Sequence, residues 1–399
     1  MIKEQSITAA EAKPAVKRNP IIDIMKGIGI FFVVVGYCGI PIGLFIYTFH
    51  MALFFMLSGY CLSSKYSASP SGWCKLVKNK FLRLYIPFVC ISIVFNLLHN
   101  YFMDINLITD NPQFLTGYLG NFFGLNQRYS DILAVIKNTL LFEPQEHVLG
   151  PTWFLSALFS ALMLYAGVKL ILIKTCPENF NTALIMLALL FSSIGFKHAG
   201  NRSFMCIYIA CTVFPLFVFT DYIKSKYSLS IGSKNAKNFI LYSVLSCVSV
   251  FIILFLKKDL NFAIDLGLNS INSPTLFILE SIVGFFFTYF LACLSTYVKT
   301  VANIFMFMGK YTLSILILHL SAFKIVTYIQ VLIYKLPEYR LSSFPVYDVS
   351  HGWWILYCLV GIVIPIACAV IFDYIKNGIY RLLPKKQHKN QKRENFSVH

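Results

Sequence analysis

Two histidines lie inside apolar stretches of the sequence, where ionisable side chains are rare. His50 stands in IYTFHMALFFMLSGY at 46–60, and His319 ends GKYTLSILILH at 309–319. An ionisable residue inside a membrane span is costly and usually faces the interior of a helix bundle. A neutral imidazole there could take a proton from a hydroxyl nucleophile and later return it. The alternative is that each histidine hydrogen-bonds a neighbouring helix and serves packing alone.

The two imidazoles are expected at similar depths in the membrane. His50 follows the outer end of its span by about eight residues, or ~12 Å, and His319 follows Gly309 on the inner side by about ten residues, or ~15 Å. In a hydrocarbon core of ~30 Å, both positions lie near the midplane. Ser58 comes nearly two turns after His50 on the same helical face. These positions predict a polar stripe that faces a cavity.

Charged residues gather near the inner ends of the first two spans. Asp23 and Lys26 are three residues apart in IIDIMKGIG and share a helical face, which predicts an ion pair. A basic stretch, GWCKLVKNKFLRLYIP at 72–87, follows the second span. It is either ordinary anchoring on the cytoplasmic side or a mouth that attracts a phosphorylated ligand. Within it Arg83 is the best candidate ligand, because a guanidinium binds phosphate oxygens in bidentate fashion.

A tryptophan marks the start of another span. Trp153 lies in GPTWFLSALF at 150–159, where Gly-Pro indicates a sharp entry into the helix. A tryptophan at the outer end of a span usually belongs to the interfacial aromatic belt. By itself this stretch carries a weak functional signal.

The composition sets the class of protein that must position these residues. Of the 399 residues, 57% are hydrophobic and 13% are charged, against about a quarter charged in soluble domains. Many apolar runs approach the roughly 20 residues that cross a membrane as a helix, and the dyad alternation of a membrane β-barrel is absent. The sequence predicts an all-α, polytopic helical membrane protein.

Ten spans are predicted, and the distribution of charge orients them. With an even number, both termini lie on one side, and basic residues in the segments and tail on that side place it in the cytoplasm. The predicted organisation is a cytoplasmic segment at 1–20, a transmembrane domain at 21–375 and a basic cytoplasmic tail at 376–399. The predicted spans are 21–40, 42–63, 84–103, 152–173, 182–198, 204–222, 239–256, 275–297, 312–334 and 352–375.

Several other classes of function find no support in the sequence. The net charge of +17 comes from residues that flank apolar spans, so we expect contact with lipid headgroups and not with nucleic acid. Most of the eleven cysteines lie inside apolar runs, and no CxxC pair or Cys/His metal spacing occurs. No GxGxxG after a strand and no HExxH motif is present, so no bound cofactor or metal is expected.

Five stretches together resemble acyltransferase family 3, integral membrane proteins that O-acylate sugars of bacterial surface polysaccharides. The resemblance covers residues 18–375, and its Phe-His-Met run with a Ser-Gly-Tyr ending is the most diagnostic piece. The stretches are RNPIIDIMKGIGIFFVVVGY at 18–37, FIYTFHMALFFMLSGY at 45–60, KFLRLYIPFV at 80–89, GPTWFLSALF at 150–159 and MGKYTLSILILH at 308–319.

This resemblance implies a bundle that takes an acyl group from cytoplasmic acyl-CoA and delivers it to a lipid-linked or exported glycan. Lys26, Lys80 and Arg83 match basic positions that would meet the CoA phosphates, and His50 and Trp153 would line the cavity. His319 and Ser58 are further candidate substrate-binding residues. The implied location is the bacterial inner membrane, and acetyl-CoA is the simplest donor.

The sequence departs from the family at one position. The family's first span usually ends in Gly-His, eleven positions after a basic residue, and that histidine is taken as catalytic. Here the basic residue is Lys26, and eleven positions later stands Tyr37. A tyrosine hydroxyl with a pKa near 10 is a poor general base at neutral pH.

The sequence therefore leaves three hypotheses. The leading one is an O-acyltransferase in which His50 transfers the proton alone or Tyr37 serves as a hydrogen-bond donor, by direct transfer or through an acyl-histidine. The second is an exporter or flippase-like protein for glycans, although inverted repeats and broken spans are not evident. The third is an inactive paralogue that partners another membrane protein.

Overall fold

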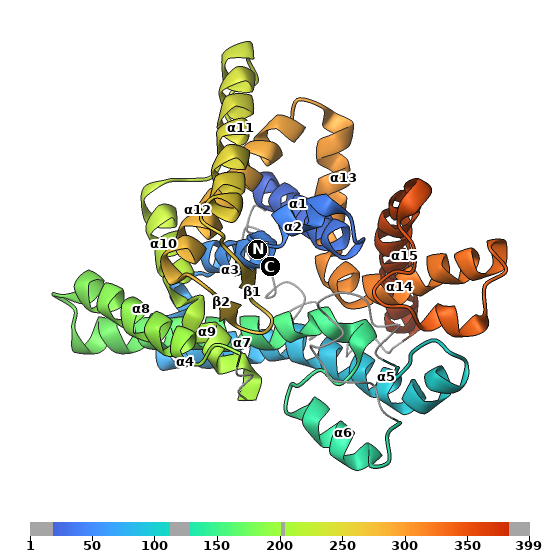
Figure 1. Cartoon of the computed structure of the whole chain (residues 1–399). Coiled ribbons are helices and arrows are strands. Elements are labelled where there is room, and N and C mark those ends of the chain that lie inside the picture. The colour runs from blue at the N-terminus through green and yellow to red at the C-terminus, as the bar shows by residue number, and fades with distance from the viewer. Residues whose placement is uncertain (1–18, 112–127, 201–203, 383–399) are drawn as a thin grey trace, which may run out of the picture.

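The computed structural model describes residues 19–111, 128–200 and 204–382, which form a bundle of α-helices with one small hairpin (Figure 1). The predicted segment 1–20 lies almost wholly, and the tail 376–399 largely, outside the described residues. The α-helices are α1 (Pro20–Tyr37), α2 (Pro41–Ile46), α3 (His50–Cys61), α4 (Pro70–Lys80), α5 (Ile86–Asp104), α6 (Ile132–Leu140), α7 (Trp153–Thr175), α8 (Phe180–Lys197), α9 (Ile207–Thr212), α10 (Phe214–Lys226), α11 (Ala236–Lys258), α12 (Pro274–Ser295), α13 (Lys299–Lys310), α14 (Thr312–Ile333) and α15 (Trp353–Leu382).

Eight helices in the described part of the chain are long and apolar enough to cross a membrane. A ninth span arises if α9 and α10, which meet at 57°, count as one. These helices confirm the predicted class, an all-α polytopic protein. They are Pro20–Tyr37, Pro70–Asp104, His147–Thr175, Phe180–Lys197, Ala236–Lys258, Pro274–Ser295, Thr312–Ile333 and Ser350–Gly378.

The structure breaks the span predicted at 42–63 into two helices. α2 begins at Pro41 and ends at Ile46, and α3 begins at His50 after Phe49, whose φ of −133° is not helical. The twelve residues of α3 rise ~18 Å, which is too short to cross a ~30 Å core. His50 is therefore the first residue of a helix that begins inside the bundle, and not a residue midway along a continuous span as the sequence suggested.

Capping residues set where several helices start. Asn19 accepts a hydrogen bond from the Ile21 amide at 3.1 Å, and Ser69 accepts one from the Gly72 amide at 3.1 Å. Proline follows each cap, as Pro20 and Pro70. Its fixed φ suits the first helical position, where no amide donor is needed. These signals make α1 and α4 begin at defined residues close to the basic side of the protein.

The spans divide into an inner and an outer set. Among the 18 most apolar consecutive residues of each span, 72% are buried in α1, 67% in α14, 56% in α7 and 50% in α12. In α8, α11 and α15 the share is 22%, and in the long helix 70–104 it is 17%. Figure 1 accordingly shows α1 and α3 near the middle and α8, α11 and α15 toward the rim. The inner helices are the ones that can carry chemistry away from lipid.

A short hairpin from the loop after α11 reaches into the bundle. Strands β1 (Ile264–Asp265) and β2 (Ser270–Ile271) pair antiparallel, with Ile264 opposite Ile271. At its tip Asn269 is buried with a positive φ of 53°. Asn269 donates to the Gly195 carbonyl at 2.8 Å and accepts from the Thr212 hydroxyl at 2.8 Å. These bonds fasten the hairpin to α8 and α9.

Candidate active site

The two histidines predicted to carry chemistry, His50 and His319, are both buried and make the same kind of hydrogen bond. His50 Nδ1 lies 2.9 Å from the Ile46 carbonyl oxygen, and His319 Nδ1 lies 2.9 Å from that of Ile315. A carbonyl only accepts, so Nδ1 of each ring carries the hydrogen. In a neutral imidazole, Nε2 then holds an unprotonated lone pair. Neither Nε2 has a hydrogen-bond partner among the described residues, and each is therefore available to accept a proton.

Two tyrosines join the histidines into one cluster. The ring of Tyr37 lies 5.2 Å from that of His319 and 5.6 Å from that of Tyr47. The ring of Tyr47 lies 5.0 Å from that of His50. We call Tyr37, Tyr47, His50 and His319 the imidazole–phenol cluster. Since α1, α2, α3 and α14 each contribute or flank one member, packing of the inner helices assembles it.

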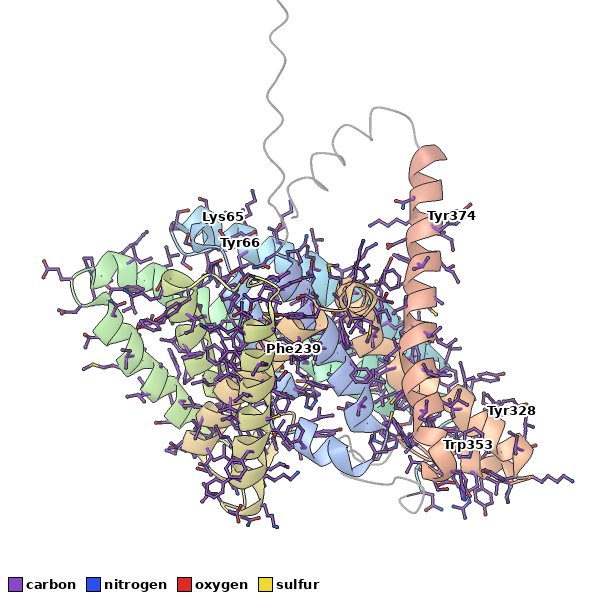
Figure 2. The ribbon with its side chains drawn as sticks, turned by 90° about the horizontal axis from the view of Figure 1, so that it is seen from above. Lys65, Tyr66, Phe239, Tyr328, Trp353 and Tyr374 are labelled. Carbon is purple, nitrogen blue, oxygen red and sulfur yellow. The ribbon has the colours of Figure 1, made fainter. Side chains whose placement is uncertain are left out.

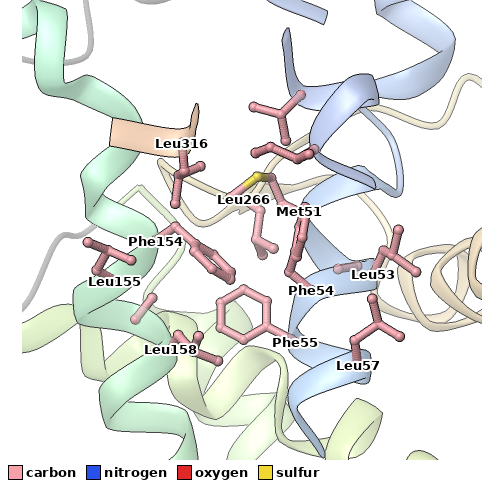
Figure 3. Close-up of a cluster of buried hydrophobic side chains, with 14 of the residues drawn as sticks. Met51, Leu53, Phe54, Phe55, Leu57, Phe154, Leu155, Leu158, Leu266 and Leu316 are labelled. Atoms are coloured by element: carbon pink, nitrogen blue, oxygen red, sulfur yellow. The ribbon is translucent and has the colours of Figure 1, made fainter. Parts of the chain in front are cut away.

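Trp153 is buried at the start of α7, close to the same helices. The preceding turn η5 (His147–Thr152) packs against α14, the helix of His319. In Figure 3 the next residue, Phe154, meets Phe55 of α3 at 4.9 Å between ring centroids. Trp153 thus lies next to the layer of apolar side chains where α3, α7 and α14 meet, although no polar contact joins its ring to the cluster.

Ser58 lies nearer the basic end of α3 than the cluster does. It is half-buried and eight residues after His50, which is ~12 Å along the helix. The predicted polar stripe of α3 therefore consists of His50 at the start of the helix and Ser58 two turns later. Apolar side chains of α3 pack against α7 between them, as Figure 3 shows.

The predicted basic residues lie near one another, at the end of the bundle that the sequence predicts to be cytoplasmic. Lys26 Nζ lies 3.7 Å from Asp23 Oδ1, as their spacing predicts. Lys80 lies close enough to Arg83 and Lys26 to feel both charges. Cations crowded together repel one another unless anions lie among them. Lys26 precedes Tyr37 by eleven residues, or ~16 Å of helix, so the basic group and the cluster lie at different levels along α1.

A π-helical turn carries Arg83. The turn η2 (Phe81–Tyr85) interrupts an otherwise continuous helix that runs from Pro70 to Asp104. Pro87 follows it and has no amide hydrogen to offer the carbonyl four residues earlier, which is that of Arg83 itself. Such turns are frequent at functional sites, and this one rotates Arg83 relative to a regular helix.

Sequence reasoning missed three residues near the cluster. Tyr47 lies one turn before His50, and its place in an apolar run made it look like core. Asp265 of β1 is close enough for its charge to act on both Tyr37 and Tyr47. Glu280 of α12 is fully buried, and its two carboxylate oxygens have no hydrogen-bond partner among the described residues. Glu280 could have been found from the sequence, because an acidic residue inside an apolar run such as LFILESIVGF is rare in a membrane span.

A second buried polar group lies toward the end of the bundle that the sequence predicts to be the outer one. His99 Nδ1 is 2.6 Å from Glu146 Oε1, and the Tyr129 hydroxyl donates to the same oxygen at 3.3 Å. The rings of His99 and Tyr129 stack at 3.7 Å. Burial raises the pKa of Glu146 above its ordinary value, while the hydrogen bond and charge of His99 act in the opposite direction. This group joins α5 to the loop that leads into Trp153.

An apolar groove of about 1040 Å³ opens between α13 and α15. Its lining contains no ionisable side chain, so it offers no general acid or base. Among the described residues, no three His, Cys, Asp or Glu side chains come together to hold a metal ion. Chemistry at this site would rest on the histidines, tyrosines and lysines.

Fold and site together define a multi-pass membrane protein with proton acceptors buried between its inner helices. The model of an acyltransferase domain, acyltransferase family 3, matches residues 19–373. The chain belongs to this family and is a membrane acyltransferase that transfers groups other than amino-acyl groups. No curated protein and no solved structure matches the chain.

Proposed function

We propose that this acyltransferase moves an acyl group, most simply acetyl, from acyl-CoA to a hydroxyl of a surface or exported polysaccharide sugar. The observation that carries the proposal is the pair of buried imidazoles, each with Nδ1 bound to a backbone carbonyl and Nε2 without a partner. A hydroxyl acceptor needs such a base, because its own proton leaves only at high pH. The proposed location is the bacterial cytoplasmic membrane.

The basic group at the inner side supports acyl-CoA as the donor. Lys26, Lys80 and Arg83 come from two helices and meet at one place. The phosphates of CoA would neutralise their mutual repulsion, and Arg83 could bind two phosphate oxygens at once. The ~16 Å of α1 between Lys26 and Tyr37 would be bridged by the extended thioester arm of the donor.

In the proposed reaction, His50 Nε2 takes the proton from the sugar hydroxyl as the oxygen attacks the thioester carbonyl. The C–S bond then breaks, and the departing CoA sulfur takes the proton back from His50. In a relay variant, Nε2 attacks the thioester first and the C–S bond breaks to release the CoA thiolate. The sugar hydroxyl then attacks the acyl-imidazole, the acyl–nitrogen bond breaks, and the hydroxyl proton passes to the thiolate. Tyr37 would hydrogen-bond the oxyanion formed in either case, since a phenol hydroxyl is a donor at neutral pH.

His319 is the second buried imidazole of the cluster. Its ring contacts Tyr37 at the position where the family has its usual histidine. Loss of the histidine at position 37 therefore leaves two imidazoles within one cluster. We assign proton transfer to His50, because Tyr47 and Thr48 beside it carry hydroxyls that suit a polar acceptor. We assign the positioning of substrate to His319.

The test is the alkali-labile ester content of surface glycan from cells that carry the intact gene, a deletion, His50→Ala or His319→Ala. His351→Ala is the matched control, because His351 is exposed on the outer side. We expect the deletion and His50→Ala to remove the ester at normal protein level, and His351→Ala to leave it unchanged. If ester content stays constant while the amount of surface glycan falls, the protein serves glycan export instead.

The donor is tested separately with membranes and acyl-CoA. Lys80→Gln and Arg83→Gln should each raise the KM for acyl-CoA about tenfold, the effect of losing one phosphate contact of 1.4 kcal/mol, with a smaller change in kcat. Lys65→Gln, an exposed residue of the same inner loop, is the control. Equal KM values in all four proteins would argue against a CoA site at this group.

A further inference from the structure

Two cysteine thiols meet between the first and the last membrane helix. Sγ of Cys38 lies 3.2 Å from Sγ of Cys358, although 320 positions separate them in the chain. Cys38 caps the end of α1, and Cys358 lies in the second turn of α15. Both side chains are buried, at 0% and 7% exposure. No other pair of cysteine sulfurs approaches this closely among the described residues.

The elements that hold the two thiols are fixed independently of them. Next to Cys358, the Tyr357 hydroxyl accepts from the Tyr347 amide at 3.2 Å and donates to Gln330 Oε1 at 2.8 Å. On the other side, the Cys38 amide donates to the Val35 carbonyl at 3.1 Å, which fixes the end of α1. The separation of 3.2 Å exceeds the length of an S–S bond by about 1.2 Å.

Both thiols lie on the outer side under the predicted orientation. Cys38 is at the end of α1 opposite Asn19 and Lys26, and α15 runs from Trp353 near Cys358 toward Tyr374. Figure 2 shows Tyr374 at the same end of the bundle as Lys65, with Trp353 at the opposite end. The space outside the bacterial cytoplasmic membrane is oxidising, and disulfides persist there.

We propose that Cys38 and Cys358 form a disulfide that ties the outer end of α1 to α15. One S–S bond forms as two S–H bonds break. The two electrons and two protons pass to the disulfide of an oxidoreductase in the outer compartment, which becomes a dithiol. Since both thiols are buried in the finished bundle, the exchange precedes the final packing of α15. The bond holds Tyr37, the neighbour of Cys38, beside His319.

The experiment counts oxidised cysteines in the full-length protein in membranes. Free thiols are blocked with N-ethylmaleimide in denaturant, disulfides are then reduced, and the released thiols are labelled with a polyethylene-glycol maleimide. We expect two labels on the wild-type chain and none on Cys38→Ser or Cys358→Ser. Cys211→Ser, which replaces another buried thiol, should keep both labels.

Any of three results would overturn the proposal. The wild-type chain could gain no label, one of the two serine variants could keep both labels, or Cys211→Ser could lose them. For protein that is poorly expressed, disulfide mapping by mass spectrometry also tests the proposal, because it detects the disulfide-linked peptides directly. The readout is independent of acyl transfer, so its failure would leave the proposed activity untouched.

Discussion

At the scale of single residues, the hydrogen bond of each buried histidine decides which nitrogen can react. Binding of Nδ1 to a carbonyl one turn earlier leaves Nε2 as the base in both His50 and His319. This arrangement needs no carboxylate partner to select the tautomer, because the backbone supplies the acceptor. For His319 it also follows from helix geometry, since the Ile315 carbonyl lies one turn earlier in α14, whereas for His50 the break between α2 and α3 brings the Ile46 carbonyl to the ring.

Tyr37→Phe tests the residue that departs from the family. Phenylalanine keeps the ring contacts with Tyr47 and His319 and removes only the hydroxyl. If that hydroxyl stabilises the oxyanion, kcat should fall about 100-fold or more, while KM for acyl-CoA stays the same. An unchanged kcat would assign Tyr37 to packing. Measurement of both constants in membranes, with Tyr328→Phe at an exposed position as control, distinguishes the two.

Glu146 gives a prediction for pH. Its pKa in the folded protein lies above the ordinary value of 4.5, chiefly because of burial. The folded state thus keeps the proton to a higher pH than the unfolded chain does. As pH rises from 4.5 toward neutrality, ionisation costs the folded state more, and stability falls. We expect the stability of wild type relative to Glu146→Gln to decline over this range.

Thermal unfolding in detergent at a series of pH values measures this difference. Glu143→Gln, a nearby acidic residue of the same loop, is the control and should show a pH profile parallel to wild type. A gap between wild type and Glu146→Gln that widens in favour of wild type with rising pH would contradict the prediction. It would mean that attraction to His99 outweighs burial.

The sequence predicted some site residues and concealed others for a physical reason. His50, His319 and the Asp23–Lys26 pair stand out, because charge is rare in apolar runs. Tyr47 does not, since a tyrosine is compatible with core, interface or site. Asp265 could not be assigned, because only the folded hairpin brings it near α1 and α2.

At the scale of elements, close crossings of helices depend on glycine. A Cβ on Gly27 of α1 would overlap the Phe305 carbonyl of α13, and a Cβ on Gly309 would overlap the Asp23 carbonyl. Two backbones in contact cannot be moved apart by a side-chain rotation. The α1–α13 crossing therefore fixes how far Asp23 and Lys26 stand from the neighbouring helix.

Gly27→Ala is expected to destabilise the protein strongly, because α1 or α13 must shift to admit the methyl group. Overpacking of this kind typically costs about 1–3 kcal/mol. The yield of folded protein in detergent and its thermal midpoint should both fall. Gly378→Ala is the control, because no atom lies within 4 Å of a Cβ there. Equal midpoints for the two variants would show that the crossing relaxes easily.

A buried lysine in α14 predicts how the outer loop is held. Lys324 donates to the carbonyls of Leu341 at 3.0 Å and Ser343 at 2.9 Å. Lys324→Met removes the donor from both carbonyls, and the buried one, that of Ser343, then costs about 1–3 kcal/mol. We expect limited proteolysis to cut the 338–346 segment faster than in wild type. Lys335→Met, at an exposed lysine, should leave the rate unchanged.

Hydropathy predicted most of the helices but not where the spans predicted at 42–63 and 204–222 break. The run from 42 to 63 is apolar throughout, and apolar length alone cannot show that Tyr47, Thr48 and Phe49 leave the helical path. The break depends on contacts across the bundle, such as Phe49 lying where a Cβ on Gly284 of α12 would be. Helix α6 and the β1–β2 hairpin were not predicted either, because both lie in segments between spans, where hydropathy gives no signal.

At the scale of the whole molecule, orientation connects the proposals. The proposed donor site must face the cytoplasm, where acyl-CoA is made, and the proposed Cys38–Cys358 disulfide must face the oxidising side. The predicted topology meets both conditions, because Lys65 and Tyr374 lie at one end of the bundle and Trp353 at the other (Figure 2). The separation of basic and aromatic residues along the bundle supports that topology.

Cys74 of α4 offers a native probe of this orientation, because it is exposed beside Lys75. A membrane-impermeant maleimide should label Cys74 in inverted vesicles and not in intact cells. The label on Cys74 is the difference between wild type and Cys74→Ser, because other cysteines such as Cys61 and Cys176 are exposed too. Glu338→Cys, between α14 and α15, should show the opposite pattern. If Cys74 were labelled from outside the cell, Lys80 and Arg83 would face away from the acyl-CoA pool. The proposed donor site and the proposed disulfide would then both fail, since each depends on the side of the membrane it faces.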